Sequence, residues 1–496
     1  MNTLEEYTEL LARIDRINSA VSLLQWDQRT KIPRDGHAGR AETLGTLSRM
    51  AFELATSDRL GALLDELRGR DGLSPVEQAS LRVVGRDYAR HKAIPPDLFE
   101  RFTVARVRSE SAWELAKEAS DFPSFSPHLS EMIDFARQFA ELFGYEDAPY
   151  DALLEEYEPG MTARTLRSII EPLREALVPL LRHLIDDGTP PETSFLEGCF
   201  DVSAQRQLAA RALQAIGYDF RAGRLDDTTH PFTIGIGPGD TRVTNRYHED
   251  LVLSGLFSAL HEGGHALYDQ GIPDELRPLG IADGSSYGVH ESQSRLWENM
   301  VGRSLPFWRH FRAAMVDVFP ALDGCSAEEF YAATNTAQPS LIRVEADEVT
   351  YNLHIMLRFE LEQALLSGDL AVDDAPDAWR EGIRDTLGVE PTCDADGVLQ
   401  DVHWSAGMFA YFPSYMLGNL YAAQLYATAR RENQDLESSI EQGDPRVLLG
   451  WLRERIHRHG QIFDPVELIE RVTGEAPSPV HFIDYLTEKY SAVYGL

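Results

Sequence analysis

The hydrophobic and polar residues along most of this chain recur with the period of an α-helix. In residues 3–26, apolar side chains fall three and four positions apart, which places them on one helical face. The segments 74–94 and 126–144 each open with a Ser-Pro pair, a serine cap followed by a proline in the first turn. Residues 162–188 and 203–220 continue the helical spacing. The pattern therefore predicts a mainly α-helical fold.

One segment, residues 230–247, departs from the helical period. It contains two short runs of β-favouring residues, at 232–236 and 242–244, on either side of a Gly-Pro-Gly turn. We expect a small β-sheet here, beside the histidine-bearing segment that follows it. An edge strand of such a sheet can hold an extended peptide through backbone hydrogen bonds.

The chain has 496 residues, which is long enough for several domains. No stretch rich in proline, serine or glycine divides it, and no repeat of fixed period is present. We therefore expect residues 1–496 to form a single domain of two helical lobes that flank a cleft.

The net charge and the cysteine positions exclude some classes of partner and of protein. The formal net charge of -34 repels phosphate backbones and anionic lipids, so neither a nucleic acid nor a membrane is an expected partner. No segment has the length and apolar character of a membrane span, and the first residues lack the apolar core of a signal peptide. Cys199, Cys325 and Cys393 lie far apart and form no CxxC pair. These features predict a cytoplasmic protein.

The strongest chemical signal is the stretch LFSALHEGGHALYDQG, residues 256–271. His261 and His265 are four residues apart, so on one face of a helix both imidazoles can reach one metal ion. Glu262 is rotated by about 100° from His261 and suits the role of general base toward a water at the metal. The alternative is a chance match to the HExxH pattern, with both histidines in the protein core.

Two glycines stand between these histidines. Gly263 and Gly264 each cost a helix about 1 kcal/mol relative to alanine. The flanking residues keep apolar side chains at helical spacing, so packing can offset that cost. Small residues leave room for a substrate or a neighbouring element to approach the metal. We therefore expect an uninterrupted helix in which the glycines provide access.

A catalytic zinc site needs a third protein ligand. Glu291 is the first candidate, because it begins an amphipathic segment and a buried carboxylate needs a partner or a metal. His290 is the rival, since imidazole also suits zinc. Glu298 is interpreted as a solvated or paired helix charge. Gln293 and Arg295 are candidates for contacts that orient the ligands.

The chain resembles the carboxypeptidase Taq family of metallocarboxypeptidases in two linked motifs. These are HEGGH and, further along the chain, HESQSR, in which Glu291 lies 26 positions after His265. The chain departs from the family pattern at Ile32, where methionine is usual, and at Ala410, where glycine is usual. Neither position is a presumed ligand. Other stretches fit the same family along the chain; they are WDQRTKIP (26–33), YDALLEEYEPGMT (150–162), HPF (230–232), DTRVT (240–244), IRVEADEVT (342–350), GVLQDVHW (397–404) and GMFAYFPSYMLGN (407–419).

The resemblance implies a large helical metallopeptidase of the zincin type with a deep central groove, usually a homodimer. It also implies a zinc or cobalt ion and the broad release of C-terminal amino acids from peptides, with proline disfavoured at the end. A fold relation to peptidases like angiotensin-converting enzyme is implied as well.

A carboxypeptidase must hold the free carboxylate at the end of its substrate, and the planar fork of arginine suits that task. Arg343, in the IRVEADEVT stretch, is the first candidate; the alternative is an i,i+4 salt bridge to Asp347. Arg242, in DTRVT, is the second candidate. By resemblance, DTRVT lies at the closed end of the pocket, which would restrict the enzyme to the ends of peptides.

The oxyanion of the tetrahedral intermediate needs hydrogen-bond donors. By resemblance, His403 and Tyr415 face the scissile carbonyl. Tyr411 is a further substrate-binding candidate, with core packing as the alternative because buried tyrosines usually find a hydroxyl partner.

Together these features predict a metal-dependent carboxypeptidase acting on peptides in one catalytic domain. His261, His265 and Glu291 would hold the metal, zinc or cobalt, and Glu262 would act as general base. One rival hypothesis is an oligopeptidase or a dipeptide-releasing enzyme on the same scaffold. Another is a peptide- or metal-binding protein in which the HExxH motif is silent.

A last prediction concerns salt. Arginine supplies almost all the positive charge, since the lysines are limited to Lys31, Lys92, Lys117 and Lys489. Acid-rich, lysine-poor surfaces suit concentrated salt, which screens their self-repulsion. A halophilic source is one hypothesis, and a merely acidic protein from a GC-rich genome is the other. The halophilic hypothesis expects the thermal unfolding midpoint to rise in molar salt; a flat or falling midpoint would remove it.

Overall fold

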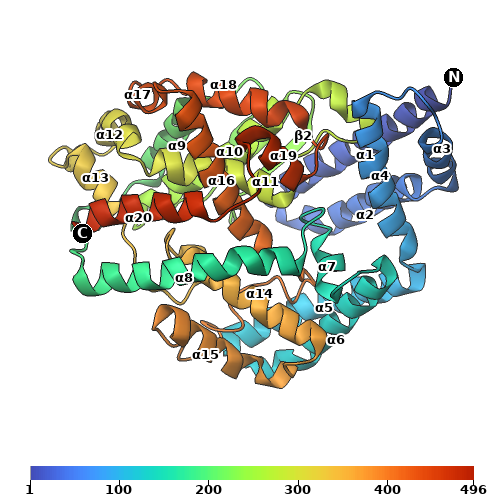
Figure 1. Ribbon diagram of the computed structural model, residues 1–496, viewed down its shortest axis with the longest axis horizontal. Helices are drawn as coiled ribbons and strands as arrows, with labels where there is room; N and C mark the ends of the chain where they lie inside the picture. The colour runs from blue at the N-terminus through green and yellow to red at the C-terminus, as the bar shows by residue number, and fades with distance from the viewer. Residues whose placement is uncertain (1) are drawn as a thin grey trace. The chain divides into compact units, whose positions relative to one another are not determined.

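The computed structural model describes residues 2–496, and the chain divides into two compact units (Figure 1). The first unit comprises Met1–Lys92, Glu192–Thr334 and Leu425–Gly474, and the second comprises Ala93–Pro191, Asn335–Gln424 and Glu475–Leu496. Both units are mainly helical, and the first contains a small sheet. The mainly helical fold with a small sheet is therefore confirmed, whereas the cleft and the single catalytic domain stay predictions.

The first unit contains the sheet and the helix with the HExxH motif. Its elements are α1 (Thr3–Thr30), α2 (His37–Ala55), α3 (Asp58–Arg68), α4 (Pro75–Ala93), α9 (Val202–Ile216), β1 (Leu225–Asp227), β2 (Thr233–Gly237), β3 (Asp240–Asn245), α10 (Val252–Gly271), α11 (Tyr287–Arg295), the π-helix η4 (Leu296–Gly302), α12 (Leu305–Val318), α13 (Ala327–Ala333), α17 (Leu436–Glu441), α18 (Arg446–Arg455) and α19 (Pro465–Thr473).

The second unit is built from helices and short 3₁₀ turns. Its helices are α5 (Pro96–Ala119), α6 (Phe122–Phe143), α7 (Pro149–Leu154), α8 (Ala163–Asp187), α14 (Tyr351–Ser367), α15 (Ala375–Leu387) and α20 (Val480–Tyr494), with the 3₁₀ turn η6 at Arg343–Glu345. Helices α8 and α20 pack side by side (Figure 1). Helix α16 (Phe412–Glu432) begins in this unit and ends in the first. None of the helices within residues 2–496 is long and apolar enough to span a membrane.

Local sequence signals place some helix ends correctly and misplace one. At the start of α4, the backbone N–H of Glu77 donates to Ser74 Oγ at 3.3 Å, and the N–H of Ser74 donates to Glu77 Oε2 at 2.6 Å. This reciprocal pair is a capping box, as the Ser-Pro signal predicts. The same signal at Ser126 is wrong, because α6 begins at Phe122 and Pro127 lies inside it. An earlier proline, Pro123, starts the helix, and its buried apolar face offsets the hydrogen bond that Pro127 cannot make.

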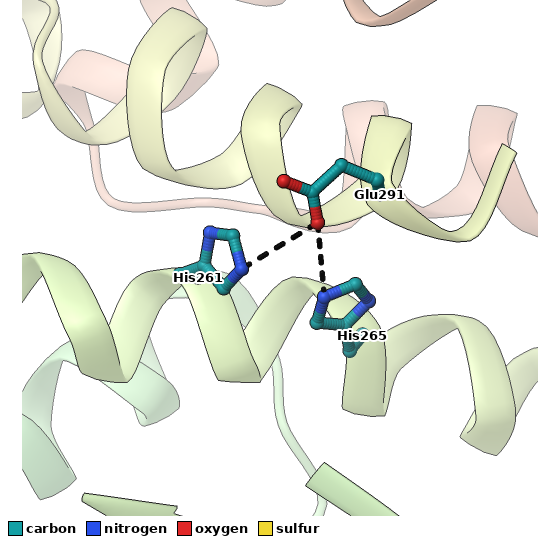
Figure 2. A group of neighbouring side chains, drawn as sticks. All are labelled: His261, His265 and Glu291. Carbon is teal, nitrogen blue, oxygen red and sulfur yellow. Dashed lines mark ion pairs between the residues drawn. The ribbon is translucent and has the colours of Figure 1, made fainter. Parts of the chain in front are cut away.

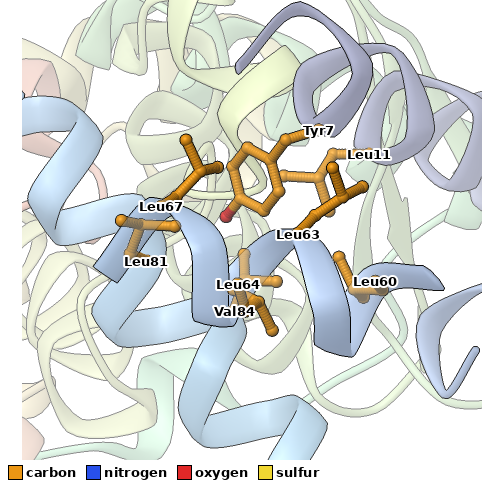
Figure 3. Close-up of a cluster of buried hydrophobic side chains, with 8 residues drawn as sticks. All are labelled: Tyr7, Leu11, Leu60, Leu63, Leu64, Leu67, Leu81 and Val84. Carbon is orange, nitrogen blue, oxygen red and sulfur yellow. The ribbon is translucent and has the colours of Figure 1, made fainter. Parts of the chain in front are cut away.

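The apolar face predicted for residues 3–26 packs against the next helices of the chain. Tyr7 and Leu11 of α1 pack against four leucines of α3 and two residues of α4 (Figure 3). The buried residues of this cluster are Tyr7, Leu11, Leu60, Leu63, Leu64, Leu67, Leu81 and Val84. The periodic apolar positions of the first helix are therefore the positions it uses for packing.

The sheet has the strand order β1-β3-β2, so β3 is central. It pairs with β1 in parallel and with β2 antiparallel, in a register that sets Thr233 opposite Val243 and Ile234 opposite Arg242. Neighbouring residues of a strand point to opposite faces, so Thr233 and Val243 share one face and Arg242 lies on the other. The two β-favouring runs predicted from the sequence are β2 and β3; the short β1 has no counterpart among the predictions.

The glycines of α10 allow close packing between helices. A Cβ atom on Gly264 would lie 2.5 Å from the carbonyl oxygen of Gln293 and 2.6 Å from Cα of Ser294, both backbone atoms of α11. A Cβ atom on Gly263 would lie 2.6 Å from the side chain of Leu213 in α9. Helix α10 is uninterrupted, as predicted. The space at the glycines is filled by α9 and α11, so the small residues give access to neighbouring helices, one of the two possibilities expected from the sequence.

This packing generates a stability prediction for Gly264→Ala. The added methyl group would meet backbone that can only move as a whole helix, so we expect a net loss of about 1–3 kcal/mol and a lower thermal unfolding midpoint. The matched control is Gly450→Ala in α18, where a Cβ atom meets nothing within 4 Å. That control should gain roughly 0.5–1 kcal/mol from helix propensity. Equal stability of the two variants would contradict the close contact between α10 and α11.

Candidate metal centre

The structure brings His261, His265 and Glu291 together. Their ligand atoms lie within 4.8 Å of one another. Nε2 of His261 is 3.6 Å from Glu291 Oε2, and Nε2 of His265 is 3.4 Å from the same oxygen. Figure 2 shows the two imidazoles on consecutive turns of α10, both turned toward the carboxylate on α11. Within residues 2–496, this is the one group of three histidine, cysteine or acidic side chains arranged to hold a metal ion.

The donor set fits a divalent cation. Two imidazole nitrogens and one carboxylate oxygen are the ligands of many hydrolytic zinc sites, and three protein ligands leave a position open for water. The separations are those of atoms grouped around a common ion at bonds of about 2 Å. An ion at their centre would also compensate the charge of Glu291, whose side chain is 8% exposed.

Glu291 is held in its charged form by its neighbours. Burial by itself would raise the pKa of this carboxyl group, but the Arg295 guanidinium and the two histidines outweigh it and lower the pKa well below its usual range. Nε of Arg295 donates to Glu291 Oε1 at 2.7 Å. The Ser294 hydroxyl lies 3.0 Å from Oε2 and 2.6 Å from the backbone carbonyl oxygen of Glu291, and it can donate to either. Arg295 therefore makes the orienting contact expected of it.

His261 is oriented by Glu298, whose Oε2 lies 2.9 Å from His261 Nδ1. Glu298 belongs to the π-helix η4 and is buried, with Arg295 and Arg303 beside it. Burial would raise the pKa of Glu298, but Arg295 and the other cations lower it to about 2, so the group is a carboxylate and accepts from Nδ1. This leaves Nε2 of His261 bare for a metal. Glu298 is thus a paired charge, one of the two interpretations given from the sequence.

His290 faces His265 through its Nδ1 atom. The two Nδ1 atoms are 2.6 Å apart, and His290 Nε2 is 3.0 Å from Asp269 Oδ1. If Nε2 of His265 binds a metal, its Nδ1 carries the proton and donates to His290, and His290 then donates from Nε2 to Asp269. Both ring nitrogens of His290 are engaged in this chain, so its geometry is that of an orienting residue. Asp269 had no role in the sequence-based prediction.

Gln293 does not contact the three donor residues. Its side-chain oxygen lies 2.9 Å from Nε2 of His457, and its amide donates to Ser292 Oγ at 3.0 Å. Its contribution to the cluster is instead through its backbone, which forms part of the close contact with Gly264. The expected orienting contact from its side chain is therefore wrong.

Glu262 lies beside the donor cluster and is 8% exposed. The Thr233 hydroxyl on β2 is 2.9 Å from Glu262 Oε2 and 2.7 Å from its backbone carbonyl oxygen, and it can donate to either. The small sheet is thus next to the HExxH helix, as expected from the sequence. Its role at this point is to hold the carboxylate of Glu262 in place.

Arg242 lies on the opposite face of the sheet from Thr233. Its guanidinium donates to both oxygens of Asp240, at 2.8 and 2.7 Å, and stacks 4.3 Å from the ring centroid of Trp26. Its side chain therefore lies on the face of the sheet opposite to the one that contacts Glu262.

Arg343 belongs to the second unit and is 4% exposed. It does not pair with Asp347, which instead accepts backbone hydrogen bonds from Gln338, Val349 and Thr350. The alternative of an i,i+4 salt bridge is therefore wrong, because residues 343–345 form a 3₁₀ turn and not a continuous α-helix. Arg343 binds Asp401.

His403, Tyr411 and Tyr415 form one cluster in the second unit. Nε2 of His403 is 3.4 Å from the Tyr415 hydroxyl, and the Tyr411 ring lies 5.4 Å from His403 and 5.2 Å from Tyr415. Burial, with help from Arg343, lowers the pKa of His403 to about 3, so its imidazole is neutral at physiological pH. Its buried Nδ1 has no hydrogen-bond partner.

Ala410, one of the two departures from the family pattern, has a backbone conformation that suits glycine. Its φ of 65° lies in the left-handed region, which glycine adopts without strain. The backbone N–H of Ala410 donates to Glu362, a buried acid that also accepts from Trp404 and Tyr150. Burial raises the pKa of Glu362 to about 7. These contacts fix both ends of the loop at residues 404–410, which directly follows His403.

Comparison with known proteins gives a consistent result over the whole chain. Residues 6–490 match the family described as carboxypeptidase Taq (M32) metallopeptidase. Thermostable carboxypeptidase 1 of Thermus thermophilus is 48% identical over 487 residues, 96% of this chain and 95% of the relative. Carboxypeptidase 1 of Bacillus subtilis is 41% identical over 494 residues, 99% of each chain. The crystal structure of an M32 carboxypeptidase from Deinococcus radiodurans R1 matches with a TM-score of 0.97 and 40% identity, covering 100% of both chains.

The contact between Glu298 and His261 predicts a loss of metal affinity in Glu298→Gln. The amide can still accept from Nδ1, but it is neutral and no longer pairs with the two arginines, so affinity should fall about 10- to 100-fold. Competition with a chromogenic chelator measures this directly. Glu432→Gln is the matched control, because Glu432 also accepts from an aromatic N–H (Trp451) and an arginine (Arg455). Unchanged affinity in Glu298→Gln would contradict the orienting role.

Proposed function

Because this chain belongs to the carboxypeptidase Taq (M32) family and is a metallocarboxypeptidase that acts on peptides, we propose that it releases single C-terminal amino acids with broad specificity. The observation that carries this proposal is the convergence of His261, His265 and Glu291, with Glu262 beside them. The three donors would hold the metal, and Glu262 is the neighbouring group suited to move a proton.

The metal of the proposal is zinc, with cobalt as the alternative. Two histidines and one glutamate are a zinc donor set, and cobalt accepts the same ligands. The coordination geometry and the availability of each metal in the cell decide between the two ions. When bound, such a cation lowers the pKa of a water molecule and polarises a carbonyl group. Restoring activity to metal-free protein with each ion separately distinguishes the two.

Glu262 is proposed as the general base. Its carboxylate takes a proton from the attacking water and delivers it to the leaving amine. Thr233 supports this role because its hydroxyl reaches both the carboxylate and the backbone of Glu262, which limits the side chain to one direction. A positioned base of this kind contributes to rate only when its geometry is held.

The substrate-binding roles of the second unit are part of the same proposal. Arg343 holds the terminal carboxylate, and His403 and Tyr415 donate to the oxyanion. The neutral imidazole and the unpartnered Nδ1 of His403 support a role in binding, because a buried polar atom without a partner is costly. Tyr411 packs against Tyr157 and Tyr415, which supports a role in shaping the site. Arg242 remains the second candidate for the substrate carboxylate.

A homodimer and a cytoplasmic location complete the proposal. The free thiols Cys199, Cys325 and Cys393 support a reducing compartment, where disulfides are rare. Sedimentation equilibrium of the full chain tests the dimer, which rests on the family resemblance.

A time course of amino-acid release tests the proposed activity. Peptides with a free or a blocked C-terminus are compared, with and without a chelator. Single residues released in order from a free C-terminus support the proposal. Dipeptide products or internal cleavage would favour the oligopeptidase hypothesis, and metal binding without any hydrolysis would favour a silent motif.

Glu262→Gln separates metal binding from proton transfer. The amide cannot accept the water proton, so turnover should fall by roughly 10²–10⁴-fold, while metal content stays at the wild-type level because Glu262 is not among the three donors. Metal content is read by elemental analysis and turnover by product release. Glu432→Gln again serves as the control, and near-normal turnover of Glu262→Gln would refute the general-base role.

A further inference from the structure

Three charged side chains are buried together in the second unit. Arg343 is 4% exposed, Arg358 is fully buried, and the Asp401 side chain is 11% exposed. Asp401 Oδ1 accepts from Nη2 of Arg343 at 2.7 Å, and its Oδ2 accepts from Nε of Arg358 at 2.7 Å. One carboxylate thus bridges two guanidinium groups. The two arginines come from different elements, η6 and α14, and Asp401 joins them.

The two histidines beside this cluster contribute no charge at neutral pH. Burial and the nearby arginines lower the pKa of His354 and of His403 to about 3. Glu362 is close enough for Arg358 to act on its pKa, but its oxygens accept from Trp404, Tyr150 and Ala410 and not from either arginine. Asp401 is therefore the only acid hydrogen-bonded to the two arginines among the described residues.

Asp401 determines which edge of Arg343 remains open. A guanidinium has five N–H groups. Asp401 takes the Nε edge together with one N–H of Nη2, and the Tyr351 hydroxyl accepts from Nη1 at 3.0 Å. One N–H is left on each terminal nitrogen, so two donors remain for the two oxygens of a carboxylate. The rings of Tyr415, Phe412 and Tyr351 lie 5.0–5.8 Å from the guanidinium carbon and limit its movement.

Arg358 cannot take the substrate itself. It is fully buried, stacks 4.5 Å from the ring centroid of Trp379, and donates to the carbonyl oxygen of His354 at 2.7 Å. It also lies 5.3 Å from the ring centroid of Phe412 and forms an ion pair with Asp401. Arg358 is therefore a fixed cation that binds Oδ2 of Asp401, while Oδ1 binds Arg343.

We propose that Asp401, anchored by Arg358, is a positioning residue that aims the free N–H pair of Arg343 at the C-terminal carboxylate of the peptide substrate. This inference rests on the proposed function, in which Arg343 binds that carboxylate. Asp401 does not touch the substrate; it acts by fixing the plane and direction of the guanidinium. Recognition of the chain end then depends on a residue 58 positions away from Arg343.

The test compares a short N-blocked peptide with its C-terminal amide. Wild-type protein should prefer the free acid, because the amide lacks the charge that Arg343 binds. In Asp401→Asn, the KM for the free acid should rise about 10- to 100-fold, the effect of a lost charged hydrogen bond, while kcat and metal content change little. The preference for the acid over the amide should shrink by the same factor.

Glu348→Gln is the matched control for a purely structural effect. Glu348 is buried in the same unit and pairs with Lys489, so this variant also breaks a buried ion pair. It should lower the thermal unfolding midpoint without changing the preference for the acid. Full acid preference in a folded Asp401→Asn protein would overturn the inference. If that variant does not fold, Arg358→Lys replaces it, and an undiminished preference there would overturn the inference equally.

The outcome also separates this inference from the proposed function. A wild-type protein with no preference between acid and amide would contradict the role of Arg343 itself. A wild-type preference that survives in Asp401→Asn would leave the role of Arg343 intact and remove only the role of Asp401.

Discussion

The contact between α10 and α11 is the constraint on which the metal-ligand cluster depends. Gly264 has no side chain, so the backbone at Gln293 and Ser294 approaches α10 more closely than any other residue would allow. This approach places Glu291, two residues before Gln293, within 3.4 to 3.6 Å of the two imidazoles. Packing between the helices also offsets the intrinsic helix cost of the two glycines, about 1 kcal/mol each. The two glycines therefore weaken the helix by itself but permit the packing that forms the cluster.

Arginine keeps three buried acids ionised, Glu291 and Glu298 in the first unit and Asp401 in the second. A buried carboxylate without a partner takes up a proton, whereas an arginine beside it never loses its charge. In the first unit, Arg295 contacts both Glu291 and Glu298, so one cation serves a donor of the cluster and an acid that orients a donor. In the second unit, two arginines hold Asp401. An acid held by arginine thus contacts an imidazole in the first unit, Glu298 with His261, and a second guanidinium in the second unit, Asp401 with Arg343.

Sequence reasoning succeeded where the signal was contained in one segment. The period of apolar residues gave the helical class, and β-favouring runs around a glycine-rich turn located β2 and β3. It failed at the start of α6, because the choice between two prolines depends on which apolar face finds a packing partner. It left open whether a substrate or a neighbouring element occupies the space beside Gly263 and Gly264, since only the positions of α9 and α11 show what fills that space.

The candidate site divides in the same way. His261, Glu262 and His265 could be grouped from spacing alone, because a helix places residues four apart on one face whatever surrounds it. The sequence also named both His290 and Glu291 as donors of suitable chemistry. Only the tertiary structure shows that the Glu291 carboxylate faces the two histidines. It also shows three pairings that spacing could not predict: His290 with Asp269, Glu298 with His261, and Arg343 with Asp401. These pairings join separate parts of the fold, and packing between elements, not local spacing, decides which side chains meet.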